Sequence, residues 1–485
     1  MKKHILFSIC FLFIVLLSNA QNGIAWDGMS MDIANNSHDN MHPRIALDGS
    51  ENPLVVWGRM SDEAVFFSRW NGSAFTAPVK LNPSWLTVAS ASWMGPDIAS
   101  KGDTVYVVVK RTPETSDTNY VYIMSSFNGG VSFAPPVRVD FIGDSISRFP
   151  TVTVDAIGNP IVAFMKFNSS FLDSRWVIAK STDFGASFSP DVKASGYSGM
   201  NAEVCDCCPG AIVSSGNVST MLYRDNNSNI RDIWTGVSTN NAISFPSGFE
   251  VDDNNWMIMS CPSSGPDGVI VGDTLYSTFM SSGSGNARTY LSKSSISDGT
   301  ANSVANLTGA ITGLTQQNYP RIASNGSAMA VVWKQNVSGT AQLPILFTNN
   351  IANGFPADYD TVDLADITNT DVALSNGKVW AVWQDDNAGT VKYRSGTYTP
   401  LGTSIDETKA DKFSVFPNPA SDILNIVPLN EGKYGLAIYN AFGQQVFSSQ
   451  LTTTKQLDIS RFSGGMYHIQ ITQGNNSHTQ TFIKQ

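Results

Sequence analysis

Hydrophobic and polar residues alternate along this chain in short runs, and one such run recurs at regular intervals. Its clearest copy, Tyr319 to Trp333, predicts two strands joined by an Asn-Gly turn, the second strand beginning at Met329. The other copies begin at His42, Gly95, Phe149, Cys208, Gly265 and Thr370. Six of the seven carry a proline at the same point, namely Pro43, Pro96, Pro150, Pro209, Pro266 and Pro320, spaced 53, 54, 59, 57 and 54 residues apart.

Strands that repeat at this interval are typical of a blade, a small sheet that cannot bury both of its faces alone. Two more strands follow the quoted pair in each copy; in the first copy they are Ala64 to Arg69 and Phe75 to Leu81. We therefore predict an all-β chain with a seven-bladed β-propeller, followed by a small C-terminal β-sandwich. The last copy, Thr370 to Tyr398, has room for only three strands, and we expect Gly23 to Ile33 to supply the fourth and close the ring.

The predicted domains are a signal peptide at 1–20, the propeller at 21–398, a polar linker at 399–412 and the terminal domain at 413–485. Lys2 and Lys3, an apolar run and Ser18-Asn19-Ala20 are typical of a secretory signal. Its removal takes the formal charge from −10 to −12, because two lysines are lost. An acidic surface argues against nucleic acid as a partner, and we expect a monomer.

Export leaves four cysteines, Cys205, Cys207, Cys208 and Cys261, in an oxidising compartment. We expect two disulfides, one of which joins Cys261 to the loop before the fourth copy. A metal site is the alternative because Glu203 and Asp206 lie close by, but C-x-C-C is not a recognised zinc spacing.

The terminal segment has a different pattern from the repeats. FPNPASDILNI from Phe416, IYNAFGQQVF from Ile438 and SGGMYHIQI from Ser463 resemble the C-terminal sorting domain of the type IX secretion system. This resemblance implies passage across the outer membrane of a Bacteroidetes-type bacterium, with the secretion machinery as a partner. The alternative is a carbohydrate-binding sandwich.

Three segments of the repeats resemble the Asp-box, S-x-D-x-G-x-S-F/W, of sialidase-like propellers. Ser181 to Phe188 matches it, Ser126 to Phe133 has Asn128 in place of the aspartate, and Ser238 to Phe245 is a degraded copy. The resemblance implies a structural turn on the face opposite the usual active site.

Two sets of charges fall near the predicted channel mouth. At the start of the inner strands, acidic and basic positions alternate, and we expect ion pairs between blades or a ligand site there. This set comprises Arg44, Asp97, Asp267, Arg321 and Asp371. The ends of the second strands are mostly basic and suggest an anionic or polyhydroxyl ligand: Arg59, Lys110 or Arg111, Lys166, Arg224 and Lys334.

The sialidase resemblance implies roles for some of these residues. Arg44, Arg224 and Arg288 would clamp a substrate carboxylate. Arg59 and Arg321, from the two charge sets, are further candidate binding residues. Tyr319 would be the nucleophile, and Asp62, beside Glu63, the acid/base. No metal or other cofactor is required.

This sequence departs from the family at two points. Cys208 stands where the family places the glutamate that assists the tyrosine, and Glu203 is the nearby substitute. The family propeller has six blades, which we keep as the alternative count. We therefore predict a secreted or cell-surface propeller that acts on or binds extracellular glycans: a sialidase-like glycoside hydrolase, or a non-catalytic surface module that binds glycan or protein.

Overall fold

The computed structural model describes residues 23–401, with gaps at 35, 115–119, 142–145 and 200–201, and residues 413–485, with gaps at 429–431, 441–442 and 474–475. The predicted signal peptide and most of the predicted linker therefore lie outside the described residues. The chain divides into two compact units, residues 1–401 and residues 402–485.

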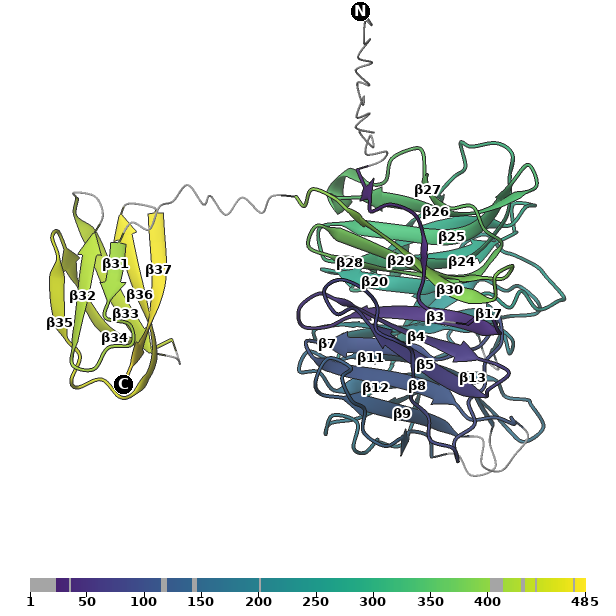
Figure 1. The fold of residues 1–485 in the computed structure, drawn as a ribbon, viewed down its shortest axis with the longest axis horizontal. Coiled ribbons are helices and arrows are strands. Elements are labelled where there is room, and N and C mark those ends of the chain that lie inside the picture. Colours follow the sequence, from purple (N-terminus) through teal and green to yellow (C-terminus); the bar gives the residue numbers. More distant parts are fainter. Residues whose placement is uncertain are drawn as a thin grey trace, which may run out of the picture. The chain divides into compact units, whose positions relative to one another are not determined.

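The described part of the first unit forms seven antiparallel sheets, and each predicted repeat lies in one of them (Figure 1). The first three sheets consist of β3 (Asn40–Leu47), β4 (Pro53–Arg59), β5 (Ala64–Arg69) and β6 (Val79–Lys80); β7 (Asp97–Lys101), β8 (Thr104–Lys110), β9 (Val121–Ser126) and β10 (Val137–Arg138); and β11 (Ile146–Val154), β12 (Pro160–Phe167), β13 (Arg175–Lys180) and β14 (Val192–Lys193).

The fourth sheet contains β15 (Glu203–Val204), β16 (Ala211–Ser215), β17 (Val218–Asn226), β18 (Ile233–Ser238) and β19 (Ser247–Glu250). The fifth contains β20 (Asp267–Val271), β21 (Thr274–Ser281), β22 (Arg288–Ser295) and β23 (Thr300–Asn306). The sixth contains β24 (Leu314–Ser324), β25 (Met329–Val337), β26 (Thr340–Thr348) and β27 (Asp360–Asp363), with a 3-10 turn, η1 (Ile351–Asn353), between its last two strands.

The seventh sheet contains strands from both ends of the unit: β28 (Ile367–Ser375), β29 (Lys378–Asp385) and β30 (Thr390–Thr397) with β1 (Ala25–Trp26) and β2 (Met31–Asp32). Ala25 pairs with Thr397 and Met31 with Tyr393. The expected closure by an N-terminal strand is therefore observed, and β30 has no open edge along these residues.

Side chains from adjacent sheets form the cores between them. Four tryptophans are fully buried because the strands that carry them are covered on both faces: Trp57, Trp333 and Trp383 on second strands, and Trp176 on the third strand β13. The inner strands contact one another in sequence, and the last, β28, packs against the first, β3. The all-β propeller predicted from the repeats is thus present in the structure.

The three segments that resemble the Asp-box share one hydrogen-bond pattern. In the turn that follows β13, Asp183 Oδ1 accepts the Ser187 N–H at 2.9 Å, and Ser181 Oγ accepts the Gly185 N–H at 2.8 Å. Asn128 and Asn240 occupy the aspartate position in the other two turns and accept the corresponding N–H groups at 3.0 and 3.1 Å. All three turns connect the third and fourth strands of their sheets.

The second unit is the small β-sandwich that the sequence predicts. Its two sheets are β31 (Phe413–Phe416), β32 (Ile423–Pro428) and β35 (Lys455–Asp458), and β33 (Tyr434–Asn440), β34 (Gln445–Leu451), β36 (Gly465–Gln473) and β37 (Asn476–Lys484). Leu424 and Ile426 of one sheet share a buried core with Leu436 and Ile469 of the other. Across the described residues of both units, no helix has the length and apolar character to span a membrane.

Candidate functional site

One cavity of the propeller lies where the inner strands begin. Its empty volume is about 630 Å³, part of which is open to solvent. Residues from five inner strands (β3, β7, β11, β24 and β28) and from the loops before β7, β16 and β20 line it, among them His42, Arg44, Trp93, Asp97, Phe149, Tyr319, Arg321 and Asn369. The prediction that matching positions of the repeats meet at one mouth is correct for Arg44, Asp97 and Arg321.

A repeated backbone irregularity gives the cavity its aromatic lining. His42, Phe149, Tyr319 and Asn369 occupy equivalent positions, and their φ angles are 56°, 52°, 52° and 61°. The pairing register shifts at this point of each strand, as between Met41 and Arg44. Such a left-handed residue is unfavourable unless the surroundings enforce it, and strained residues of this kind gather at functional sites. All four side chains line the cavity.

The loop before β7 covers part of the mouth. Asn369 Nδ2, on β28, donates a hydrogen bond to the Ser92 carbonyl at 2.8 Å, which ties this loop to the seventh sheet. Trp93 beside it packs edge-on against Phe149, with the ring centroids 5.8 Å apart. This contact was not predicted, because the strand pattern does not show how a loop folds over the mouth.

The acidic residues of the inner set join neighbouring sheets. One carboxylate oxygen of each aspartate accepts a backbone N–H from the next inner strand: Asp97 from Val152 at 3.0 Å, Asp267 from Ile322 at 2.9 Å and Asp371 from Ile45 at 3.0 Å. The predicted bridging is therefore present, although a large part of it runs through the backbone.

The two arginines of this set differ from each other. Arg321 Nε lies 3.3 Å from Asp267 and 3.1 Å from Asp371, so this arginine is shared between two aspartates as predicted. Arg44 is not shared in this way: it donates to the Pro43 carbonyl at 2.7 Å and to His42 Nε2 at 2.8 Å. Its burial, together with the nearby Arg321, lowers its pKa to about 10.

His42 is held in one neutral form. Burial, with Arg44 and Arg321 nearby, keeps its pKa well below the usual value. Because a guanidinium can only donate, His42 Nε2 accepts and Nδ1 carries the hydrogen. With His42 neutral, the two arginines and three aspartates of the inner set sum to a formal charge of −1, and of these five Arg44, Arg321 and Asp97 line the cavity.

Tyr319 lines the cavity, but its hydroxyl is not activated as a nucleophile. Burial, and secondarily the charge of Asp386, raises its pKa. Glu203, the proposed assisting carboxylate, is exposed and accepts the Asp173 N–H at 3.1 Å. Asp62, the proposed acid/base, is 45% exposed and pairs with Arg59 at 2.9 Å.

The structure does not assemble the predicted three-arginine clamp. Arg224 is fully buried, and it donates to the carbonyls of Ser264, Arg231 and Met280 at 3.2, 2.7 and 2.7 Å. Arg288 donates to the Leu314 carbonyl at 2.5 Å. Neither lines the cavity that contains Arg44 and Tyr319. The period-two pattern placed these arginines at strand ends but could not tell which way their side chains point.

The second, basic set is largely neutralised by ion pairs. Lys166 binds Asp191 at 2.8 Å, Lys334 binds Asp366 at 3.3 Å, and Arg59 binds Asp62. Lys110 donates to the Arg111 carbonyl at 3.1 Å. This set therefore does not form the anion-attracting focus that was one interpretation of the sequence.

One of the two predicted disulfides is present. Cys207 is bonded to Cys261, which joins the loop before β16 to the loop before β20. The expected second bridge is not formed: Cys205 and Cys208 are buried free thiols. The sulfur atoms of Cys205, Cys207 and Cys208 lie close enough together to hold a metal ion, but Cys207 is engaged in the disulfide.

The fold and the cavity define a class: a β-propeller with an aromatic, mixed-charge cavity where its inner strands begin, joined to a small β-sandwich. Residues 414–485, which form that sandwich, match the family "Secretion system C-terminal sorting domain". The predicted sorting domain is confirmed, and the chain is a secreted or cell-surface protein of a Bacteroidetes-type Gram-negative bacterium.

Solved structures similar to the chain include a protein of unknown function from Dyadobacter fermentans DSM 18053, at 10% identity, 78% coverage of this chain, 99% of that chain and a TM-score of 0.45. The Hadza microbial sialidase Hz136 is similar at 10% identity, 76% and 68% coverage and a TM-score of 0.45. A PL25 ulvan lyase is similar at 10% identity, 78% and 95% coverage and a TM-score of 0.47. No curated protein matches the sequence.

Proposed function

We propose that the propeller binds an extracellular glycan in the cavity at the start of its inner strands, as a non-catalytic surface module. The observation that carries this proposal is the combination of Trp93, Phe149 and Tyr319 with Arg44, Arg321 and Asn369 around one cavity. Aromatic faces pack on the apolar faces of sugar rings, while a few fixed polar groups bind hydroxyls.

The charge of the cavity favours a polyhydroxyl ligand over a strongly anionic one. Asp267 and Asp371 already hold Arg321, and the carboxylate of Asp97 also lines the cavity. A carboxylate ligand would have to compete with these aspartates for the same guanidinium. A neutral sugar hydroxyl can instead accept from an Arg321 nitrogen and donate to an aspartate oxygen.

Hydrolysis by the sialidase scheme is the second candidate, and the same geometry disfavours it. The scheme needs an activated tyrosine, an acid/base and three converging arginines, whereas only Tyr319 and Arg44 lie in the cavity. A tyrosine whose pKa is raised is a weaker nucleophile at neutral pH.

The deciding experiment combines turnover with binding. The exported protein, residues 21–485, is incubated with fluorogenic sialosides and also applied to a glycan array. We expect the wild type to turn over the sialosides no faster than the Tyr319→Phe variant does. We also expect it to retain at least one neutral oligosaccharide on the array. Turnover by the wild type that Tyr319→Phe abolishes would contradict the proposal and establish the hydrolase.

A further inference from the structure

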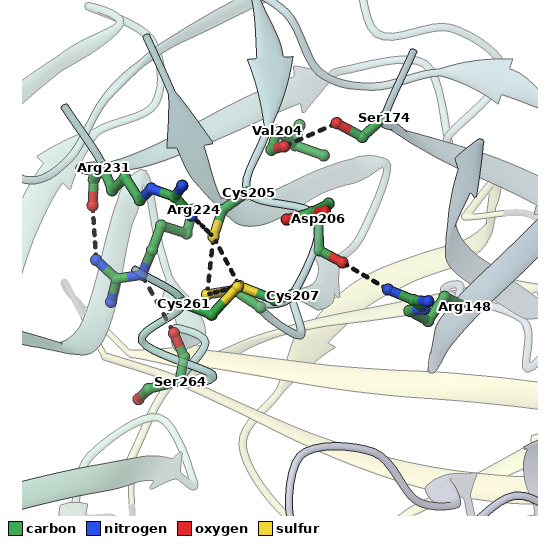
Figure 2. The surroundings of a disulfide bond; sticks show 11 residues. Arg148, Ser174, Val204, Cys205, Asp206, Cys207, Arg224, Arg231, Cys261 and Ser264 are labelled. Carbon is green, nitrogen blue, oxygen red and sulfur yellow. Dashed lines mark hydrogen bonds between the residues drawn. A yellow bond between two sulfur atoms is a disulfide. The ribbon is translucent and has the colours of Figure 1, made fainter. Parts of the chain in front are cut away.

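Four sulfur atoms lie together, three from the loop between β15 and β16 and the fourth, that of Cys261, from the loop before β20. Cys205 Sγ is 3.1 Å from Cys208 Sγ and 3.4 Å from Cys207 Sγ, and Cys207 Sγ is 4.0 Å from Cys208 Sγ (Figure 2). Cys207 is in turn bonded to Cys261. The two free thiols are therefore in van der Waals contact with each other, and Cys205 also touches the existing disulfide.

The sulfur atoms differ in their access to solvent. Cys261 is exposed, Cys207 is half-buried, and Cys205 and Cys208 are buried. The buried pair has C-x-x-C spacing, which is the spacing of thiol–disulfide oxidoreductase sites. The exposed disulfide thus lies between solvent and a buried dithiol.

Cys205 is set up as the attacking thiolate. Arg231 Nη1 lies 2.9 Å from its sulfur, and Figure 2 shows this side chain reaching toward it. The pKa of Cys205 is lowered to about 6 despite burial, mainly by a hydrogen bond from Cys208 and also by the charge of Arg231. Burial raises the pKa of Cys208. The thiolate is the nucleophile in disulfide exchange, and a pKa near ambient pH is optimal for it.

Backbone contacts fix the loop that carries these sulfur atoms. The Cys205 N–H donates to the Arg224 carbonyl at 2.9 Å, and the Cys208 N–H donates to the Cys205 carbonyl at 3.3 Å. Arg148 Nη1 donates to the Asp206 carbonyl at 3.0 Å. These contacts hold the sulfur atoms within reach of one another without a rearrangement of the sheets.

We propose that these four cysteines form an internal thiol–disulfide exchange site, in which the bridge moves between the exposed pair Cys207–Cys261 and the buried pair Cys205–Cys208. The Cys205 thiolate attacks Cys207 Sγ, a Cys205–Cys207 bond forms, and Cys261 leaves as a thiolate that takes up a proton. Cys208 then attacks Cys205 Sγ, and Cys207 leaves with the proton that Cys208 gives up. One disulfide and two thiols are present before and after, so no external oxidant is consumed.

The exchange has a chemical consequence at the surface. It opens the link between the loops before β16 and β20 and releases the exposed Cys261 as a thiol. A soluble disulfide or a disulfide of another protein can exchange with the Cys261 thiolate, so that Cys261 forms a mixed disulfide and the other sulfur leaves as a thiolate, whereas the dithiol in its starting position is buried. The site therefore connects a buried redox pair to solvent through its own disulfide.

The test uses the full exported chain in the form that carries one disulfide. Intact mass identifies this form, because it has two fewer hydrogens than the all-thiol form. The native protein is incubated with N-ethylmaleimide, quenched in acid and digested with trypsin without reduction. Cleavage after Lys193, Arg224, Arg231 and Arg288 places three cysteines in peptide 194–224 and Cys261 in peptide 232–288. A Cys205–Cys208 bridge is then a link within peptide 194–224, whereas the Cys207–Cys261 bridge links the two peptides.

We expect Cys261 to acquire the label over time while the link between the peptides is replaced by one within peptide 194–224. A link between the peptides that persists for hours in the native protein, with Cys261 unlabelled, overturns the proposal. Because this measurement uses the wild-type chain, it does not depend on the folding of a variant.

Two variants then assign the roles. In Cys205→Ser, Cys261 should stay unlabelled, and labelling at the wild-type rate overturns the assignment of Cys205 as the nucleophile. In Arg231→Gln, labelling of Cys261 at pH 7 should slow about twofold, because a rise of one unit from a pKa of about 6 lowers the thiolate fraction of Cys205 from about 0.9 to about 0.5. An unchanged labelling rate would overturn the role of Arg231 in activating Cys205, without contradicting the exchange itself.

Discussion

Arg224 is predicted to be a structural residue that joins the fourth and fifth sheets, and replacing it with lysine tests this. Its guanidinium bonds to three carbonyls, those of Ser264, Arg231 and Met280, and lies over Trp256 with 5.2 Å to the ring centroid. A lysine ammonium at the same depth can reach one of these carbonyls, so about two charge-assisted hydrogen bonds are lost. At about 1.5–3 kcal/mol each, Arg224→Lys should cost roughly 3–6 kcal/mol of unfolding free energy.

Tryptophan fluorescence during urea unfolding measures this loss selectively. All 11 tryptophans precede residue 402, so the signal reports the propeller unit and not the sorting domain. Arg288→Lys is the matched control, because Arg288 is only partly buried; it should cost no more than about 1 kcal/mol. The reasoning is refuted if Arg224→Lys unfolds at the wild-type urea concentration but loses glycan binding, since Arg224 would then be a ligand residue.

Three other predictions concern the stability of the propeller, followed in each case by tryptophan fluorescence. First, stability should fall as pH rises from about 4 to about 7. Burial raises the pKa of Asp225 to about 6 and that of Asp252 to about 7, so the folded state binds more protons than the unfolded one in this range, and the change should be about 3 kcal/mol or more. Asp252→Asn should flatten the profile; a stability that climbs over this range would show that the carboxyls are not protonated in the fold. Second, Asp183→Ala should cost about 1 kcal/mol, whereas Asp183→Asn should be nearly neutral because Asn128 and Asn240 serve in the equivalent turns. Equal losses in both variants would contradict a role in hydrogen bonding. Third, Trp26→Phe removes the hydrogen bond from Trp26 Nε1 to Asp360 at 2.7 Å and should cost about 1–2 kcal/mol. Trp85→Phe, at a half-exposed tryptophan, is its control, and similar losses in the two would mean that β1 adds nothing to the closure.

The sequence predicted the fold well because its signals are local. Glycine-containing turns such as Asn-Gly, together with alternating strands, mark the hairpins, and the predicted strand from Ala64 to Arg69 has those bounds in the structure. The need to close the last sheet followed from simple strand counting, and Ala25 and Met31 pair with β30 accordingly.

The site was predicted only in part, because it depends on side-chain directions and on irregular segments. Arg321 was found from its position in the repeat, since equivalent inner positions meet around the axis. Arg224 was misassigned because its side chain points between two sheets. Trp93 was missed because its loop is held across the mouth by long-range contacts, such as those of Ser92 with Asn369 and of Trp93 with Phe149, which the strand pattern does not show.

The most direct test of the account is the dissociation constant of a retained oligosaccharide for Trp93→Ala compared with Trp85→Ala. Both variants remove one tryptophan from the same unit, but only Trp93 lines the cavity. The account predicts at least about tenfold weaker binding by Trp93→Ala and wild-type binding by Trp85→Ala. Equal affinities of the two variants would contradict the cavity as the glycan site.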